Sequence, residues 1–87
     1  MIHLIKVFYF ARLKESLNYS TEDMELPFNV KTIAQLKVHL AERGETWADL
    51  FGGQQSIRAA INHALVDNDA TINSGDEVAF FPPVTGG

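Results

Sequence analysis

The sequence of 87 residues contains no cysteine. Without thiols the chain has no disulfide framework, no thiolate zinc site and no cysteine nucleophile. The apolar runs are also short. A run such as Val78–Phe81 falls far short of the ~20 residues that a membrane-spanning helix needs. The segment Met1–Val7 lacks the basic start and the cleavage site of a secretory signal. The sequence therefore predicts a cytoplasmic protein that does not enter a membrane.

Basic residues are few. Seven Lys and Arg stand against eleven Asp and Glu, which gives a formal net charge of −4, and the basic residues are scattered singly along the chain. Proteins that bind nucleic acid gather Lys and Arg on one face, so we expect no nucleic-acid partner. Val, Ile, Leu and Phe make up 26 of the 87 residues. This share is well above the roughly 20% below which a chain stays disordered, and it predicts one folded domain.

Motifs for metal binding or covalent catalysis are missing as well. The three histidines, His3, His39 and His63, have no zinc-ligand spacing, and the acidic turns form no twelve-residue calcium loop. No serine lies in a Gly-x-Ser-x-Gly elbow, and Gly52-Gly53 lacks the Lys-Ser/Thr that completes a phosphate loop. We expect no metal and no cofactor bound by the chain alone.

The hydrophobic periodicities predict a series of short elements, of which one helix is the best specified. Thr32 and Gln35 form a Thr-x-x-Gln capping box, and an apolar stripe follows until Gly44, a residue suited to the left-handed position that ends helices. In chain order we expect a strand at 2–10, a helical turn at 11–17, a polar loop at 18–23, a strand at 24–28, a helix at 33–43, a short turn at 46–51, a strand at 57–62, an extended pair at 65–66 after a tight turn, and a final strand at 77–81.

This order of strands and helix is an α+β layout in which one main helix covers one face of a sheet. It is the arrangement of the β-grasp, or ubiquitin-like, fold, with a mixed sheet of four to five strands. We expect a β-grasp domain at residues 1–81 and a flexible, extended diglycine tail at residues 82–87.

The predicted tail has a composition suited to threading through a narrow channel. Pro82 and Pro83 stiffen the exit from the last strand, Val84 and Thr85 are smaller, and Gly86 and Gly87 have no side chain. Without Cβ atoms the two glycines can pass where other residues cannot, so an enzyme can reach the terminal carboxylate. The reactive group would then belong to the main chain, at Gly87.

The block Asp76-Glu77-Val78-Ala79-Phe80-Phe81-Pro82-Pro83-Val84-Thr85-Gly86-Gly87 resembles the carboxy-terminal signature of the small subunits of molybdopterin synthase, the MoaD family. Further matches are Lys6-Val7, Tyr9-Phe10-Ala11, Ala60-Ile61-Asn62 and Leu65-Val66, so the resemblance spans nearly the whole chain. It departs where the family often has Arg-Glu and this chain has Lys14-Glu15, and where the family commonly has Asp-Gly-Asp and this chain has Asn73-Ser74-Gly75-Asp76.

The resemblance implies a sulfur carrier that is the small subunit of a sulfurtransferase and has no activity alone. A ubiquitin-activating-type adenylyltransferase would adenylate the carboxylate of Gly87 with ATP, and a sulfur donor protein would displace AMP to leave a thiocarboxylate. Adenylation is needed because a carboxylate is a poor electrophile. The tail would then enter the large synthase subunit, in an expected heterotetramer, and its sulfur would help to build molybdopterin from the cyclic pterin precursor.

Strand parity predicts a docking surface as well as a tail. If Tyr9 and Phe80 point toward the helix, as do the other residues of their parity, then Phe10 and Phe81 lie on the opposite face of the sheet. Exposed apolar groups there need a partner. Phe10, Leu65 and Phe81 also match positions that the family uses for apolar contacts with both the activating enzyme and the large subunit.

Two other functions share the fold and the diglycine end. A thiamine-pathway sulfur carrier is usually shorter and lacks the Phe80-Phe81-Pro82-Pro83 block. A ubiquitin-like protein modifier would use the same adenylate to form isopeptide bonds with lysines of target proteins. A copurifying neighbour distinguishes the three: a large synthase subunit, a thiazole synthase or a ladder of conjugates.

Overall fold

The computed structural model describes residues 3–52 and 57–82. Within them the chain forms one five-stranded sheet with the strand order β2-β1-β5-β3-β4. The elements are β1 (Leu4–Tyr9), α1 (Arg12–Leu17), β2 (Thr21–Glu25), α2 (Ile33–Ala41), α3 (Glu45–Trp47), the π-helical turn η1 (Ala48–Gly52), β3 (Arg58–Ile61), β4 (Ala64–Val66) and β5 (Glu77–Phe81). The mixed sheet with one main helix confirms the predicted β-grasp fold.

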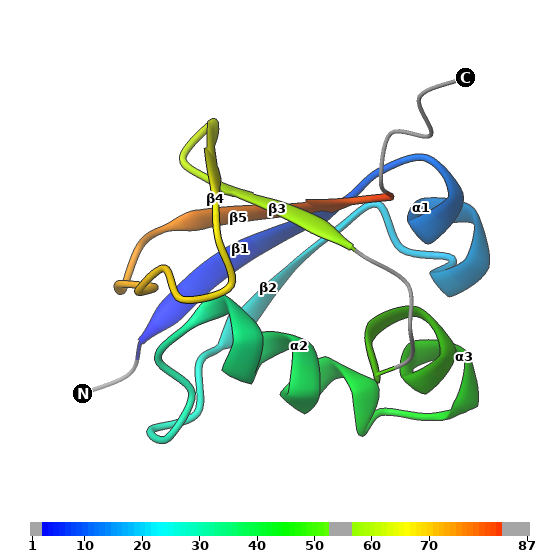
Figure 1. Ribbon diagram of the computed structural model, residues 1–87, viewed down its shortest axis with the longest axis horizontal. Helices are drawn as coiled ribbons and strands as arrows, with labels where there is room; N and C mark the ends of the chain where they lie inside the picture. Colours follow the sequence, from blue (N-terminus) through cyan, green and yellow to red (C-terminus); the bar gives the residue numbers. More distant parts are fainter. Residues whose placement is uncertain (1–2, 53–56, 83–87) are drawn as a thin grey trace.

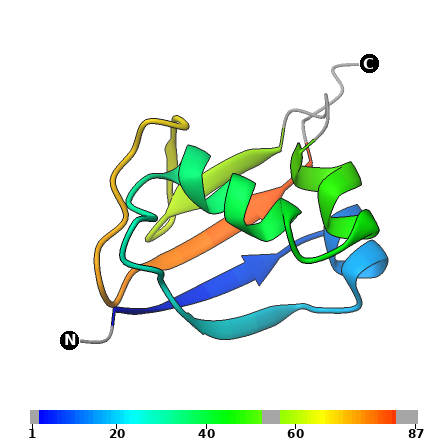
Figure 2. The same cartoon turned by 90° about the horizontal axis from the view of Figure 1, so that it is seen from below.

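The molecule has two layers. In Figure 1 the sheet runs across the upper part of the molecule, and α2 and α3 lie together below it. Figure 2, seen from the helix side, shows α2 crossing over the strands. In the described part of the chain no helix lies over the other face of the sheet (Figure 1). The face turned away from α2 is called the open face below.

The centre of the sheet is the pair β1 and β5, which run parallel with Val7 opposite Val78. The other neighbours are antiparallel: β2 along β1, β3 along β5, and β4 along β3. β3 and β4 are joined by the turn predicted from the sequence, where Asn62 and His63 have φ values of 50° and 75°. Positive φ at both central residues is the geometry of a two-residue hairpin turn.

The core lies between the sheet and α2, and the predicted strand parity is confirmed. Tyr9 and Phe80 are buried beneath the helix, and Leu36 and Leu40 on α2 pack against the same cluster. The predicted capping box begins the helix: Thr32 Oγ1 accepts from the backbone N–H of Gln35, and Gln35 Oε1 accepts from the backbone N–H of Thr32. Burial of side chains of this size is the main source of stability in a small domain.

The second strand was predicted too late in the chain. Residues 18–23 were expected to be a loop, but β2 already begins at Thr21, opposite Phe8, and ends at Glu25, before Pro27. The sequence predicts the strand at 24–28 because a polar stretch at 18–23 leads into it, yet Phe28 is 88% exposed. Pairing with β1 set the position of β2 along the chain. Polar residues are compatible with this position because β2 is an edge strand, where polar side chains can face solvent.

The main helix ends two residues before the predicted boundary. After Ala41 the backbone N–H of Glu42 bonds to the carbonyl of His39, so the last turn is tighter than an α-helix. Gly44 does not take the predicted left-handed conformation, because its φ of 161° and ψ of −178° are extended backbone. The helix therefore needs no glycine cap, and Gly44 instead leads into α3.

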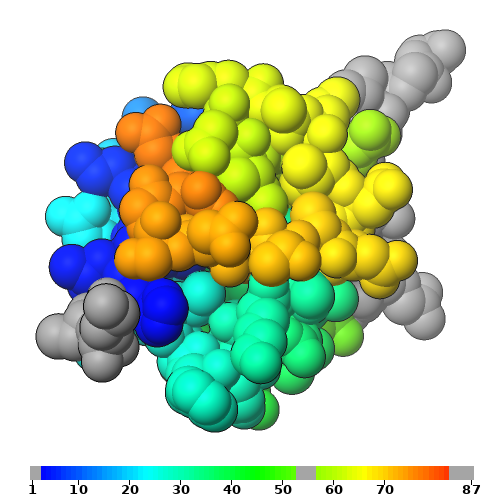
Figure 3. All heavy atoms as spheres, turned by 90° about the vertical axis from the view of Figure 1, so that its left-hand side faces the viewer, coloured from blue at the N-terminus to red at the C-terminus, as the bar shows by residue number. Residues whose placement is uncertain are grey.

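The connection between β4 and β5 covers one end of the core. Figure 3 shows this segment, gold to orange, lying between the sheet and the teal residues at the start of α2. The backbone N–H groups of Ile33 and Ala34 donate to the carbonyls of Ala70 and Asn68. Lys37 on α2 adds a side-chain link, with Nζ donating to the Ile57 carbonyl and to Asn68 Oδ1. Burial lowers the pKa of Lys37.

Candidate docking face

A row of small and apolar side chains crosses the open face. Register places Phe8 on β1 opposite Ala79 on β5, Ala79 opposite Ala60 on β3, and Ala60 opposite Leu65 on β4. Directly paired residues on neighbouring strands point to the same side of a sheet. The row is therefore continuous across four strands, with two alanines between larger apolar residues.

The two alanines leave a hollow with a volume of about 230 Å³ on this face. The rings of Phe8 and Phe10 stack nearly parallel beside it, with centroids 6.4 Å apart. The hollow is lined by Phe8, Phe10, Ala60, His63, Glu77, Ala79 and Phe81. Sequence analysis missed Phe8, His63 and Glu77 as members of this face. The parity of Phe8 with Phe10 was a signal that could have identified Phe8.

The structure describes four of the predicted partner-binding residues, Phe10, Leu65, Phe81 and Pro82. Phe10 and Phe81 line the hollow, Phe10 being 49% exposed and Phe81 partly exposed. Leu65 is 63% exposed at the outer end of the apolar row. Pro82 follows β5 directly. Pro83, Val84, Thr85, Gly86 and Gly87 lie outside the described residues.

The end of β5 that leads toward Pro82 lies beside the exposed aromatic Phe10. Because β1 and β5 are parallel, both strands finish at the same end of the sheet (Figure 1). The backbone N–H of Phe10 donates to the carbonyl of Phe80 at 3.1 Å. A partner that binds Pro82 therefore also contacts the apolar open face, at the end of the sheet where β1 and β5 finish.

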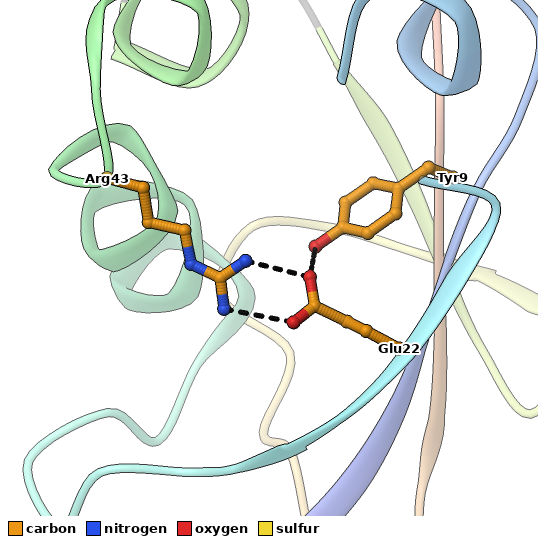
Figure 4. A network of polar contacts seen from close by, with 3 residues as sticks. All are labelled: Tyr9, Glu22 and Arg43. Atoms are coloured by element: carbon orange, nitrogen blue, oxygen red, sulfur yellow. Dashed lines mark hydrogen bonds and ion pairs between the residues drawn. The ribbon is translucent and has the colours of Figure 1, made fainter. Parts of the chain in front are cut away.

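A polar network behind this end holds β1 to β2 and to the end of α2. Figure 4 shows Glu22 of β2 between Tyr9 and Arg43. The Tyr9 hydroxyl donates to Glu22 Oε2 at 2.8 Å, and the Arg43 guanidinium donates to both carboxylate oxygens at 2.8 and 3.1 Å. Arg43 also lies over the ring of Trp47, 4.7 Å from its centroid. The network fixes Tyr9, whose neighbour Phe10 is on the open face.

Burial and pairing act together on the pKa values in this network. Burial, followed by the hydrogen bond to Glu22, raises the pKa of Tyr9 far above its usual range, so the phenol stays protonated and donates. Burial alone would raise the pKa of Glu22, but the hydrogen bonds from Arg43 and Tyr9 and the charge of Arg43 outweigh it. The pKa of Glu22 is therefore lowered, and the carboxylate stays ionised in the folded protein.

We expect Glu22→Gln to destabilise the fold by about 1.5 kcal/mol at pH 7, because it leaves Arg43 half-buried without its bidentate anion. The melting temperature should fall by roughly 5–10 °C. A carboxyl whose pKa is lowered by folding stabilises above its unfolded pKa, near 4.5. That stabilisation is lost as the pH falls through the lower folded value. Urea unfolding at pH 7 and pH 3 should therefore show a difference between variant and wild type that shrinks in acid.

Asp23→Asn is the matched control. Asp23 is next in sequence and pairs with Lys6 at 3.9 Å, with the two side chains 49% and 74% exposed for Lys6 and Asp23. An exposed pair of this kind contributes little, so its loss should change the free energy of unfolding by less than about 0.5 kcal/mol. Equal effects of the two substitutions would show that the network has no special role in stability.

Among residues 3–52 and 57–82 there is no group of three or more His, Asp and Glu side chains placed to hold a metal ion. Within that same part of the chain, no helix combines the length and the apolar character needed to cross a membrane.

Comparison with known sequences identifies the family and its relatives. The sequence model of the ThiS family matches residues 7–87. Over 84 residues the chain is 40% identical to the molybdopterin synthase sulfur carrier subunit of Escherichia coli strain K12, and the match covers 97% of this chain and 100% of that protein.

Solved structures agree on the fold. The crystal structure of small archaeal modifier protein 1 from H. volcanii superimposes with a TM-score of 0.74 at 21% identity, covering 93% of this chain and 98% of that one; at this identity the likeness shows the fold alone. A chain in the complex of subunits 1 and 2 of the molybdopterin-converting factor from Helicobacter pylori 26695 matches with a TM-score of 0.61 and 26% identity, covering 97% of this chain and 99% of that one.

Proposed function

The chain belongs to the ThiS family, and we propose that it is the sulfur carrier subunit of a molybdopterin synthase, acting in molybdenum cofactor biosynthesis. The observation that carries this function is the 40% identity to such a subunit over nearly the whole of both chains. The open face with its exposed Phe10 and Leu65 supports it, because a carrier must present a docking surface to its enzymes.

The reactive atom in this proposal is the carboxylate of Gly87. One of its oxygens attacks the α-phosphorus of ATP in an adenylyltransferase, and pyrophosphate leaves. Hydrosulfide released by a donor protein then attacks the acyl carbon, and the bond from that carbon to the AMP oxygen breaks, which leaves a thiocarboxylate on Gly87. The adenylate supplies the leaving group that a free carboxylate lacks. Because this step uses ATP, the proposed place of action is the cytoplasm.

The large synthase subunit is the proposed second partner. The similar chain from H. pylori is part of a complex of subunits 1 and 2, which is an assembly of this kind. In our proposal Phe10, Leu65 and Phe81 make apolar contacts, and residues 82–87 enter the active site of the large subunit. Gly86 and Gly87 fit a narrow channel because they have no Cβ. The groups that bind the pterin precursor and transfer protons then belong to the large subunit, in a heterotetramer.

The thiocarboxylate can be detected directly. After incubation with the adenylyltransferase, ATP and a sulfur donor, the intact mass should rise by the difference between one sulfur and one oxygen atom. Fragmentation of the terminal peptide should place the change on Gly87. Omitting ATP should leave the mass unchanged, because no acyl adenylate forms.

Sulfur on an internal residue would contradict the carrier mechanism. The charged carrier should also form molybdopterin when mixed with the large subunit and the cyclic pterin precursor. Binding to a thiazole synthase in place of the large subunit would instead indicate the thiamine pathway, and a ladder of lysine conjugates would indicate a protein modifier.

A further inference from the structure

The hollow on the open face is more than an apolar patch, because one of its ends carries a carboxylate. Along β5, Glu77, Ala79 and Phe81 are alternate residues and all line the hollow. Alternate residues of a strand point to the same face about 6–7 Å apart. The hollow therefore runs from an acid at Glu77, over a small side chain, to an aromatic ring beside the end of β5.

The sides of the hollow differ in character. On the β1 side the stacked rings of Phe8 and Phe10 form an aromatic wall. On the β3 side Ala60 continues the shallow floor, and His63 lies at the end next to Glu77. The shape suits a long, narrow side chain with an apolar stem that covers the alanines.

The carboxylate of Glu77 is available to such a side chain. It is 45% exposed, and its backbone groups, rather than its carboxylate, make the hydrogen bonds with Asn62. His63 Nε2 lies 3.6 Å from Glu77 Oε1, an ion pair only when the imidazole is protonated. Lys6, opposite Glu77 on β1, has its ammonium 3.9 Å from Asp23. A carboxylate accepts up to four hydrogen bonds, so Glu77 retains capacity for a cation.

We propose that the hollow receives an arginine side chain of the protein that docks on the open face, with its guanidinium on Glu77 and its methylene stem over Ala79 and Ala60. Arginine fits better than lysine, since its planar guanidinium pairs with a carboxylate through two hydrogen bonds and also stacks on aromatic faces. Phe8, which lies opposite Ala79 next to Glu77 on β5, supplies such a face. The inference rests on the proposed function, because it names what the same docking face recognises.

A probe that needs no partner protein tests the recognition itself. The ¹⁵N-labelled chain is titrated with N-acetyl-arginine amide and, separately, with N-acetyl-citrulline amide, a neutral analogue of nearly the same shape. The arginine compound should shift the amide signals of Glu77 and Ala79, and citrulline should not. In Glu77→Gln the arginine shifts should disappear, whereas Glu25→Gln, which removes an equal charge from β2, should keep them. Equal shifts from both compounds, or arginine shifts that survive Glu77→Gln, would overturn the proposal.

Calorimetry with the large synthase subunit then separates this inference from the proposed function. Wild-type chain should bind, and Glu77→Gln should bind at least tenfold more weakly with a smaller salt dependence, while Glu25→Gln binds as the wild type does. If the wild type does not bind, the proposed function is wrong. If the wild type binds and Glu77→Gln binds equally well, the proposed function stands and the arginine site is wrong.

Discussion

Deleting Gly87 should abolish adenylation and leave the fold intact. In a tail that reaches an active site through a channel, the reacting atoms must arrive within about 1 Å of the right position. Removal of one extended residue withdraws the carboxylate by ~3.3 Å, so ATP–pyrophosphate exchange should fall to background. The melting temperature and the circular dichroism should not change, because the core cluster is made of residues between Ile5 and Phe80.

Two further variants distinguish the effect of tail length from the effect of side-chain size in the tail. Adding one alanine after Gly87 moves the carboxylate too far by a similar distance and should also stop pyrophosphate exchange. Gly86→Val keeps the length but introduces a branched side chain, and should fail because the channel excludes it. Normal exchange by the deletion variant would show that the terminal carboxylate is not threaded into the activating enzyme.

Replacing Phe81 by Glu should weaken binding to the large subunit about 100-fold, which is about 2.7 kcal/mol. The substitution places a charge among the apolar side chains of the hollow, at the residue that precedes Pro82. The loss of stability should stay below about 1 kcal/mol, because Phe81 is only partly buried and does not belong to the core cluster. Calorimetric titration measures the binding, and urea unfolding measures the stability.

Phe28→Glu is the matched control for this substitution. Phe28 is 88% exposed between β2 and α2 and does not line the hollow. Its replacement by Glu makes the same change of side chain as Phe81→Glu. Its binding should equal that of the wild type. If Phe81→Glu unfolds the protein while its folded fraction binds normally, Phe81 is a core residue and the docking face is wrongly assigned.

Strand alternation predicted the two faces of the sheet because the period of side chains along a strand is fixed by backbone geometry. Tyr9 and Phe80 alternate with Phe10 and Phe81, and the structure buries the first pair beneath α2. The start of α2 was equally predictable, since a capping box is a local signal carried by Thr32 and Gln35. Such features depend on residues that are close in sequence.

Features that depend on register were not predictable in the same way. Ala60 and Ala79 carry no signal separately, and they make a hollow only because β3 and β5 pair with these two residues opposite each other. Tyr9, Glu22 and Arg43 are likewise far apart in sequence, and they meet through the pairing of β1 with β2 and the position of the end of α2. The misplaced β2 has the same cause, because its limits follow its partner strand.

The parallel pairing of β1 with β5 has a consequence for synthesis on the ribosome. Val7 pairs with Val78, a separation of 71 residues, so the two central strands cannot meet until nearly the whole chain has been made. Contacts between such distant residues slow folding, because a long loop must close before they form. A nascent chain that stops before β5 lacks the middle of its sheet. We therefore expect the sheet to form only after Phe81 has been made.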